Sequence, residues 1–254
     1  MRQAVRAIVT VIAALMPAAG RAQEAVVVPD SVTPQRVLDG SNLYNGGSCA
    51  ACHAIAGRGV GERAPDLSDI EWLHSEGDFV GIFETIFWGV SEKEMKAVSP
   101  RPFEMHPRGG MNVDREQMKA LAAYVWTISR PETHPFVAKQ ARFLELVREG
   151  RGGEGVAMFR VARESDREHL ILPEGGLNRL GYEVLETDPR AAIALFELNV
   201  ETHPEAWNVY DSLGEAYMVA GDRDAAIQNY RRSLELNPEN NNAIEKLGEL
   251  GAAP

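Results

Sequence analysis

The sequence contains very little cysteine: two residues in 254, Cys49 and Cys52, only three positions apart. Two thiols exclude a disulfide-rich scaffold, and a loop this short would stabilise a fold little by cross-linking. After the first 22 residues no apolar run is long enough to cross a bilayer. Basic residues are also in deficit, with a net charge of −11, so nucleic acids and anionic membrane surfaces are poor candidates as partners.

The first 22 residues have the pattern of a secretory signal peptide. Arg2 and Arg6 precede a largely apolar run at 7–19, and small residues lead to an expected cleavage after Ala22. An uncleaved membrane anchor is the less favoured alternative, because the run is short for a span and Pro17 interrupts it. Cleavage would remove three arginines and no acid, which changes the net charge from −11 to −14. We therefore expect a periplasmic protein.

Cys49, Cys52 and His53 form the C-x-x-C-H pattern by which c-type haem is attached. On one helical turn the two thiols face the same way, so each can form a thioether with a haem vinyl group, and His53 can present its imidazole to the iron. A thioredoxin-like dithiol would follow a strand, and a zinc site would need about four ligands. A plain disulfide does not account for His53. We expect one covalently bound haem c.

Residues 34–130 around this motif resemble the class I cytochrome c family. The resemblance rests on Leu43 and Tyr44 in a helix entering the motif, a glycine-rich loop at 56–68, the sequence "MHPRGG" and a last helix, "DREQMKALAAYVWTIS". It implies that the Pro65 carbonyl in "APDL" binds the second ring nitrogen of His53, which orients the imidazole. It also implies that Met105 is the sixth iron ligand.

The sixth ligand has alternatives, because His106 and Arg108 replace the proline and hydrophobic residue usual in the family. Met111, His106, Met95 and an open site therefore remain possible. Met118 and Met158 are expected in helix cores.

The residues between the haem motif and Met105 are rich in aromatic and aliphatic side chains. We expect them to form an apolar wall for the porphyrin: Trp72, Leu73, Phe79, Ile82, Phe83, Ile86, Phe87 and Trp88. His74 lies in a polar stretch and is expected at the surface. In the last helix, the apolar residues recur at helical spacing, and Leu121, Tyr124 and Val125 should pack on the N-terminal haem helix.

The second half contains a repeat with a period of 34 residues. Equivalent positions are Ala192 and Ala226, Phe196 and Tyr230, and Pro204 and Pro238. The period and residue pattern resemble tetratricopeptide repeats, which stack helical hairpins. We expect a linker and a degenerate hairpin at 131–173, with the hairpin itself at 137–165. Two repeats and a capping helix should follow at 174–254.

These observations predict an all-α protein: a cytochrome c helical domain around one haem, then a short array of helical hairpins. The expected function is one-electron transfer through a His/Met-ligated haem, with no catalytic residue assigned. The repeats would dock a redox partner protein or a second copy of the chain. The alternative is a haem enzyme or gas or redox sensor with an open sixth position, for which His106 or Arg108 would supply a polar distal group. A role as a subunit of a periplasmic dehydrogenase system also remains open.

Overall fold

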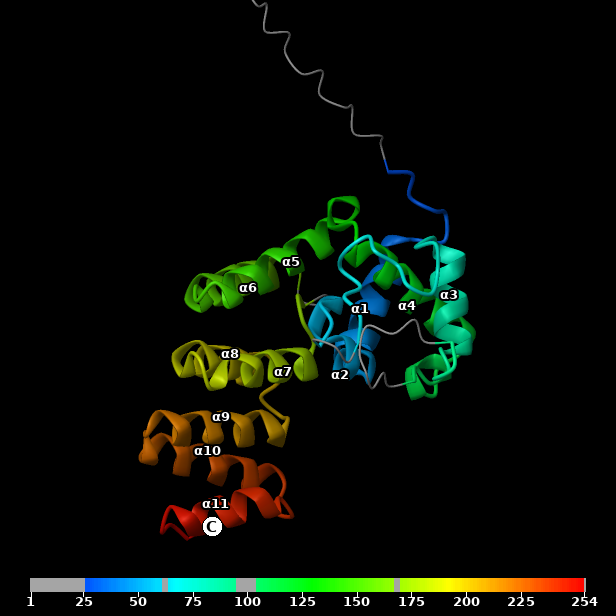
Figure 1. The fold of residues 1–254 in the computed structure, drawn as a ribbon. Coiled ribbons are helices and arrows are strands. Elements are labelled where there is room, and N and C mark those ends of the chain that lie inside the picture. The colour runs from blue at the N-terminus through cyan, green and yellow to red at the C-terminus, as the bar shows by residue number, and fades with distance from the viewer. Residues whose placement is uncertain (1–25, 61–63, 95–103, 167–169, 254) are drawn as a thin grey trace, which may run out of the picture.

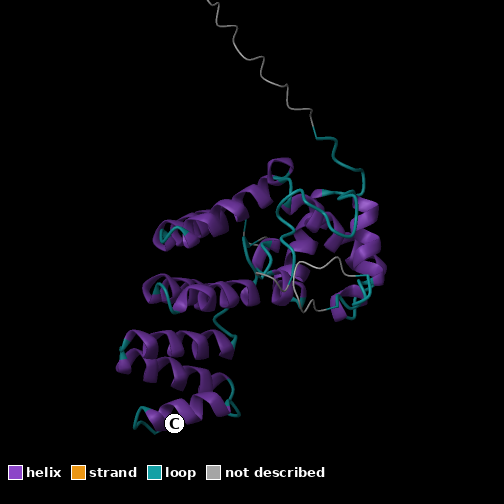
Figure 2. Cartoon of the chain, viewed as in Figure 1, coloured by secondary structure: helices purple, strands orange, loops and turns teal. Residues whose placement is uncertain are grey.

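The computed structural model describes residues 26–60, 64–94, 104–166 and 170–253. The predicted signal peptide and Met95 lie outside these ranges. Within them all regular structure is helical except one isolated antiparallel bridge, between Val90 and Met105 (Figure 2), which confirms the all-α prediction. None of the described helices combines the length and hydropathy needed to span a membrane.

The first half contains four α-helices and three short 3₁₀ turns. They are α1 (Pro34–Gly46), α2 (Cys49–His53), η1 (Ile55–Gly57), α3 (Phe79–Trp88), η2 (Pro107–Gly110), α4 (Arg115–Ile128) and η3 (Pro131–Thr133). The second half contains α5 (Pro135–Arg148), α6 (Gly152–Ser165), α7 (Glu174–Leu185), α8 (Pro189–Thr202), α9 (Trp207–Ala220), α10 (Arg223–Leu236) and α11 (Asn241–Glu249).

Helices α1 and α4 cross in close contact and form the base of the first half. Asp114 caps α4 through a capping box with Gln117, which satisfies two backbone N–H groups that the helix leaves unpaired. At the crossing, a Cβ added to Gly40 would lie 2.0 Å from the carbonyl oxygen of Ala120. One turn further, the rings of Tyr44 and Tyr124 pack with centroids 5.3 Å apart. The predicted packing of Tyr124 on the N-terminal helix is confirmed.

Helix α4 is buried around most of its circumference, beyond the single face that its periodicity predicts. The predicted core positions are buried, but so are Ala123, Trp126 and Thr127. Helix α1 covers one side of α4, α3 covers another, and η3 and α5 follow directly from its end. The Arg130 guanidinium covers the Trp126 ring at 4.7 Å from its centroid. Helix α4 is therefore the central element of this half.

The second half is a stack of antiparallel helix pairs (Figure 1). Helix α7 pairs with α8 and α9 with α10, and α11 closes the array against α10. The positions 34 residues apart are equivalent in space, since Ala192, Ala226, Phe196 and Tyr230 are all fully buried. The side chain of Asp188 accepts a hydrogen bond from the Ala191 N–H, so a capped turn starts α8 where other repeats use glycine.

A further helix pair, α5 and α6, lies between the first half and the repeats (Figure 1). Phe143 and Phe159 join the two helices, with ring centroids 5.5 Å apart. Helix α6 packs on α8, where the Arg160 guanidinium binds the Glu201 carboxylate. The pair therefore extends the array by one hairpin toward the first half.

Candidate functional site

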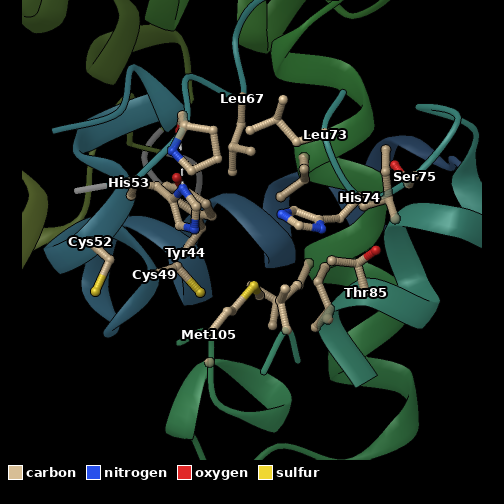
Figure 3. Close-up of a pocket in the computed structure, with 18 of the residues that line it drawn as sticks. Tyr44, Cys49, Cys52, His53, Leu67, Leu73, His74, Ser75, Thr85 and Met105 are labelled. Carbon is tan, nitrogen blue, oxygen red and sulfur yellow. Dashed lines mark hydrogen bonds between the residues drawn. The ribbon is translucent and has the colours of Figure 1, made fainter. Parts of the chain in front are cut away.

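A cavity of about 360 Å³ lies among the helices of the first half, within the size range of cofactor sites. Helix α2 contributes the haem motif, and α3 and α4 contribute aliphatic side chains. The lining includes Cys49, Cys52, His53, Pro65, Trp72, His74, Ile82, Ile86, Met105, Leu121 and Val125. The walls are thus mainly apolar, with sulfur and imidazole groups at a few points (Figure 3).

His53 projects from the end of α2 into this cavity (Figure 3). Its Nδ1 lies 3.2 Å from the Pro65 carbonyl oxygen, the partner that the family resemblance implied. Burial lowers the pKa of His53, and the Pro65 carbonyl only partly opposes this. In the neutral imidazole, Nδ1–H donates to Pro65 and Nε2 keeps its lone pair. The ring is therefore oriented to offer Nε2 to a metal.

Cys49 and Cys52 are both free thiols on the same helix as His53. Burial raises the pKa of Cys49 to about 11, so this group is a thiol at neutral pH, which disfavours a redox-active dithiol. In the described part of the chain no group of three or more His, Cys, Asp or Glu side chains could hold a metal, which disfavours a zinc site.

Met105 is held beside the cavity by the isolated bridge. The Val90 N–H donates to the Met105 carbonyl at 2.8 Å, and the Met105 N–H donates to the Val90 carbonyl at 3.0 Å. Gly89 makes this approach possible: its φ is 72°, and a Cβ there would lie 2.1 Å from the Met105 oxygen. Figure 3 shows the thioether directed into the cavity.

The rivals of Met105 are placed differently. Met111 is half-buried, does not line the cavity, and has its sulfur against Gly47 beside α1. His106 does line the cavity, but its side chain is 67% exposed and its Nδ1 lies 3.3 Å from the Glu104 carboxylate. Among the described candidates, Met105 is therefore the sulfur ligand nearest to the expected chemistry, and its ligation remains a prediction.

The predicted aromatic wall is only half correct. Helix α3 has two faces: Ile82 and Ile86 line the haem-motif cavity, whereas the other side lines a separate cavity of about 450 Å³. The second cavity is bounded by Phe79, Val80, Phe83, Glu84, Phe87, Trp88, Arg115 and Lys119. Trp88 is 72% exposed. The reason is the 3.6-residue period, which cannot direct four successive aromatic positions to one side.

His74 is a second correction. We expected this residue at the surface, but it is half-buried and its imidazole points into the cavity (Figure 3). Its neighbours Trp72 and Leu73 also line the cavity. The signal in the sequence was the flanking apolar pair, which indicates that an intervening turn is packed rather than solvated.

Two buried polar atoms in the cavity wall indicate what the site could enclose. The Tyr44 hydroxyl and the Trp72 indole nitrogen have no hydrogen-bond partner in the described part of the chain. Burial raises the pKa of Tyr44 well above its usual range, so its hydroxyl keeps the proton. Buried donors normally find acceptors. A haem, with two carboxylates on an otherwise apolar ring, fits the donors, the apolar walls, the thiols and the imidazole.

Comparison with protein families agrees with this geometry. Residues 37–129 match the cytochrome c family, and residues 207–240 match the tetratricopeptide repeat. The chain carries a cytochrome c domain followed by a tetratricopeptide repeat. Within such a domain the Cys49 and Cys52 pair implies covalently attached haem c. Cytochromes of this type are extracytoplasmic and exchange electrons with redox partners, and tetratricopeptide repeats suggest protein interactions.

A curated relative gives a similar result. The cytochrome c domain is similar to the FixP subunit of a cbb3-type cytochrome c oxidase from Sinorhizobium medicae (strain WSM419), with 34% identity over 95 residues. The match covers 37% of this chain and 31% of the relative. The chain thus aligns with about a third of that subunit, and the similarity applies to the cytochrome segment.

Proposed function

We propose that the protein is a periplasmic electron carrier in which His53 and Met105 are the axial ligands of one haem c. The observation that carries this proposal is the Val90–Met105 bridge, which fixes a thioether at the wall of the cavity that His53 enters. When bound, the haem supplies one-electron chemistry, and a thioether in the sixth position raises its potential and fills the coordination sphere. No residue of the cavity is assigned a catalytic role.

The residues of the cavity would orient and insulate the cofactor. Pro65 fixes the His53 tautomer, and an outer hydrogen bond of this kind raises the basicity of a ligating imidazole. Cys49 and Cys52 would hold the porphyrin edge covalently. Ile82, with 2% exposure, and its apolar neighbours would exclude water from the iron. These contributions are binding, orientation and electrostatics, which a carrier requires.

Spectra of the haem-loaded chain test the assignment. We expect wild type to be low-spin with a sulfur-to-iron absorption band in the ferric form. Met105→Ala should lose this band, whereas Met111→Ala should retain it and serve as the matched control. Loss of the band only in Met111→Ala would assign the other sulfur. Absence of covalent haem after acid-acetone extraction would refute the function altogether.

A second function is favoured by one observation, the imidazole of His74 in the cavity. A polar group there suits a haem enzyme or a gas or redox sensor with an open or weakly held sixth position. Under this alternative the ferrous wild-type protein is high-spin and binds carbon monoxide readily, and His74→Ala changes the carbon monoxide dissociation rate. Under the carrier proposal carbon monoxide binds slowly, and only after Met105 is replaced does it bind fast.

We also propose the division of the chain into a signal peptide at 1–22, the cytochrome c domain at 34–130, a linker with a degenerate hairpin at 131–173, and the repeats at 174–254. The repeats would dock a redox partner or a second copy of the chain. Sedimentation of the haem-loaded protein over a hundredfold concentration range separates the two, because only self-association produces a concentration-dependent dimer. The electron donor and acceptor, including a periplasmic dehydrogenase or an oxidase, follow from partner capture.

A further inference from the structure

A fully buried cluster of polar side chains lies where the cytochrome c domain meets the helical array. Its members are Ser41 and Asn45 on α1, Tyr124 on α4 and Gln140 on α5, each with no exposed area. Burying this many polar groups is unfavourable unless each finds partners. Every side-chain donor and acceptor of Asn45, Tyr124 and Gln140 takes part in a hydrogen bond, so the cluster specifies one arrangement.

Gln140 connects this cluster to the chain that enters the repeats. Its Oε1 accepts from the Tyr124 hydroxyl, and its Nε2 donates to Ser41 Oγ at 3.1 Å and to the Ile171 carbonyl at 2.6 Å. Ile171 is fully buried and lies two residues before Pro173, the N-cap of α7. Gln140 itself lies beyond residues 37–129, the segment that matches the cytochrome c family.

The other end of the cluster reaches the loop that follows the haem motif. Asn45 Nδ2 donates to the Tyr124 hydroxyl at 2.9 Å, while Asn45 Oδ1 accepts from the Ala56 N–H at 3.1 Å. Ala56 is an alanine with φ of 52°, a conformation that needs such support.

The supported loop continues to the proximal histidine. The carbonyl of Gly57 accepts from the Leu67 N–H. Leu67 lies two residues after Pro65, whose carbonyl accepts from His53 Nδ1. A continuous series of hydrogen bonds and short backbone segments therefore runs from Gln140 to the imidazole.

We infer that Gln140 is a positioning residue for His53, so that the hairpin and repeats hold the haem-ligand loop in place. The inference rests on the proposed function of His53 as an iron ligand. A partner that moves the chain at Ile171 would change the hydrogen bond to His53 and with it the reduction potential. Because coupling is reciprocal, the oxidation state would also change the affinity of the repeats for that partner.

Gln140→Leu tests the inference, because leucine is of similar size but neither donates nor accepts. The control is Gln228→Leu on α10, where the glutamine is exposed. Two quantities are measured on the haem-loaded full chain: amide hydrogen exchange in peptides covering 54–59 and 64–68, and the ferrous-to-ferric ratio at a fixed potential.

We expect exchange at 54–68 to become at least tenfold faster in Gln140→Leu. A less basic His53 favours ferrous iron, so the ferrous-to-ferric ratio should rise about threefold, equivalent to about 28 mV at 59 mV per tenfold change. Gln228→Leu should change neither. If Gln140→Leu does not fold, Tyr124→Phe must show the same two changes, since it removes one hydroxyl from the series and keeps the ring.

A lower melting temperature with both quantities unchanged would overturn the inference and leave Gln140 a merely structural residue. Faster exchange with an unchanged ratio would also overturn it, because the loop would then be uncoupled from His53. Failure of the proposed function is seen separately, in the wild-type spectrum, before any Gln140 variant is compared.

Discussion

Gly40 at the crossing of α1 and α4 allows a quantitative test of the packing beneath the haem site. A Cβ in Gly40→Ala would lie 2.0 Å from the Ala120 oxygen, 2.6 Å from its carbon and 2.8 Å from Tyr124 Cβ. Two of these atoms are backbone, which cannot rotate away, so the helices must separate. We take the upper part of the usual overpacking cost, about 3 kcal/mol, and subtract about 1 kcal/mol for replacing a helical glycine.

The expected net loss in the free energy of unfolding is thus about 2 kcal/mol. Gly153→Ala is the matched control, because Gly153 is helical and a Cβ there meets nothing within 4 Å. That variant should gain about 0.5–1 kcal/mol. Urea unfolding followed by circular dichroism measures both, and the loss in Gly40→Ala corresponds to a melting decrease of about 4–8 °C. Equal stability of the two variants would refute the close approach of α1 and α4.

Two further predictions concern α3 and His203. Ile82→Ala should lower the free energy of urea unfolding by about 2–5 kcal/mol, whereas Trp88→Ser, on the opposite face, should change it by about 0.5 kcal/mol or less; similar losses would contradict the two-faced helix. Burial lowers the pKa of His203, so its contribution to stability is complete above the usual imidazole value and is lost as pH falls through the folded-state pKa. The melting temperature of His203→Gln should therefore fall less than that of wild type between about pH 7.5 and pH 5.

The parts of the fold that the sequence predicts are those with a local pattern. The C-x-x-C-H motif requires one helical turn, and the structure provides it in α2. The positions 34 residues apart, such as Ala192 and Ala226, are buried equivalently because each repeat is a single hairpin of fixed length. The start of α4 follows from Asp114 and Gln117, whose side chains satisfy backbone groups next to them.

The parts that the sequence does not predict depend on contacts between distant segments. The inward position of His74 depends on the turn before α3 packing against the cavity, to which no local period points. Gln140 is an ordinary polar residue in a helix, and its role depends on Tyr124, sixteen residues earlier, and on Ile171, thirty-one residues later. The orientation of Trp88 follows from the phase of α3, which aromatic content alone cannot give.

The burial of Gln140 has a consequence for how this protein can be recombined. Family comparison would cut the chain after residue 129, but the cut would leave the Tyr124 hydroxyl and Ser41 in an exposed seam that the hairpin normally seals. A homologous cytochrome grafted in front of these repeats would need the same polar residues on its first and last helices. The two modules, separable in sequence, are therefore heritable only as a matched pair.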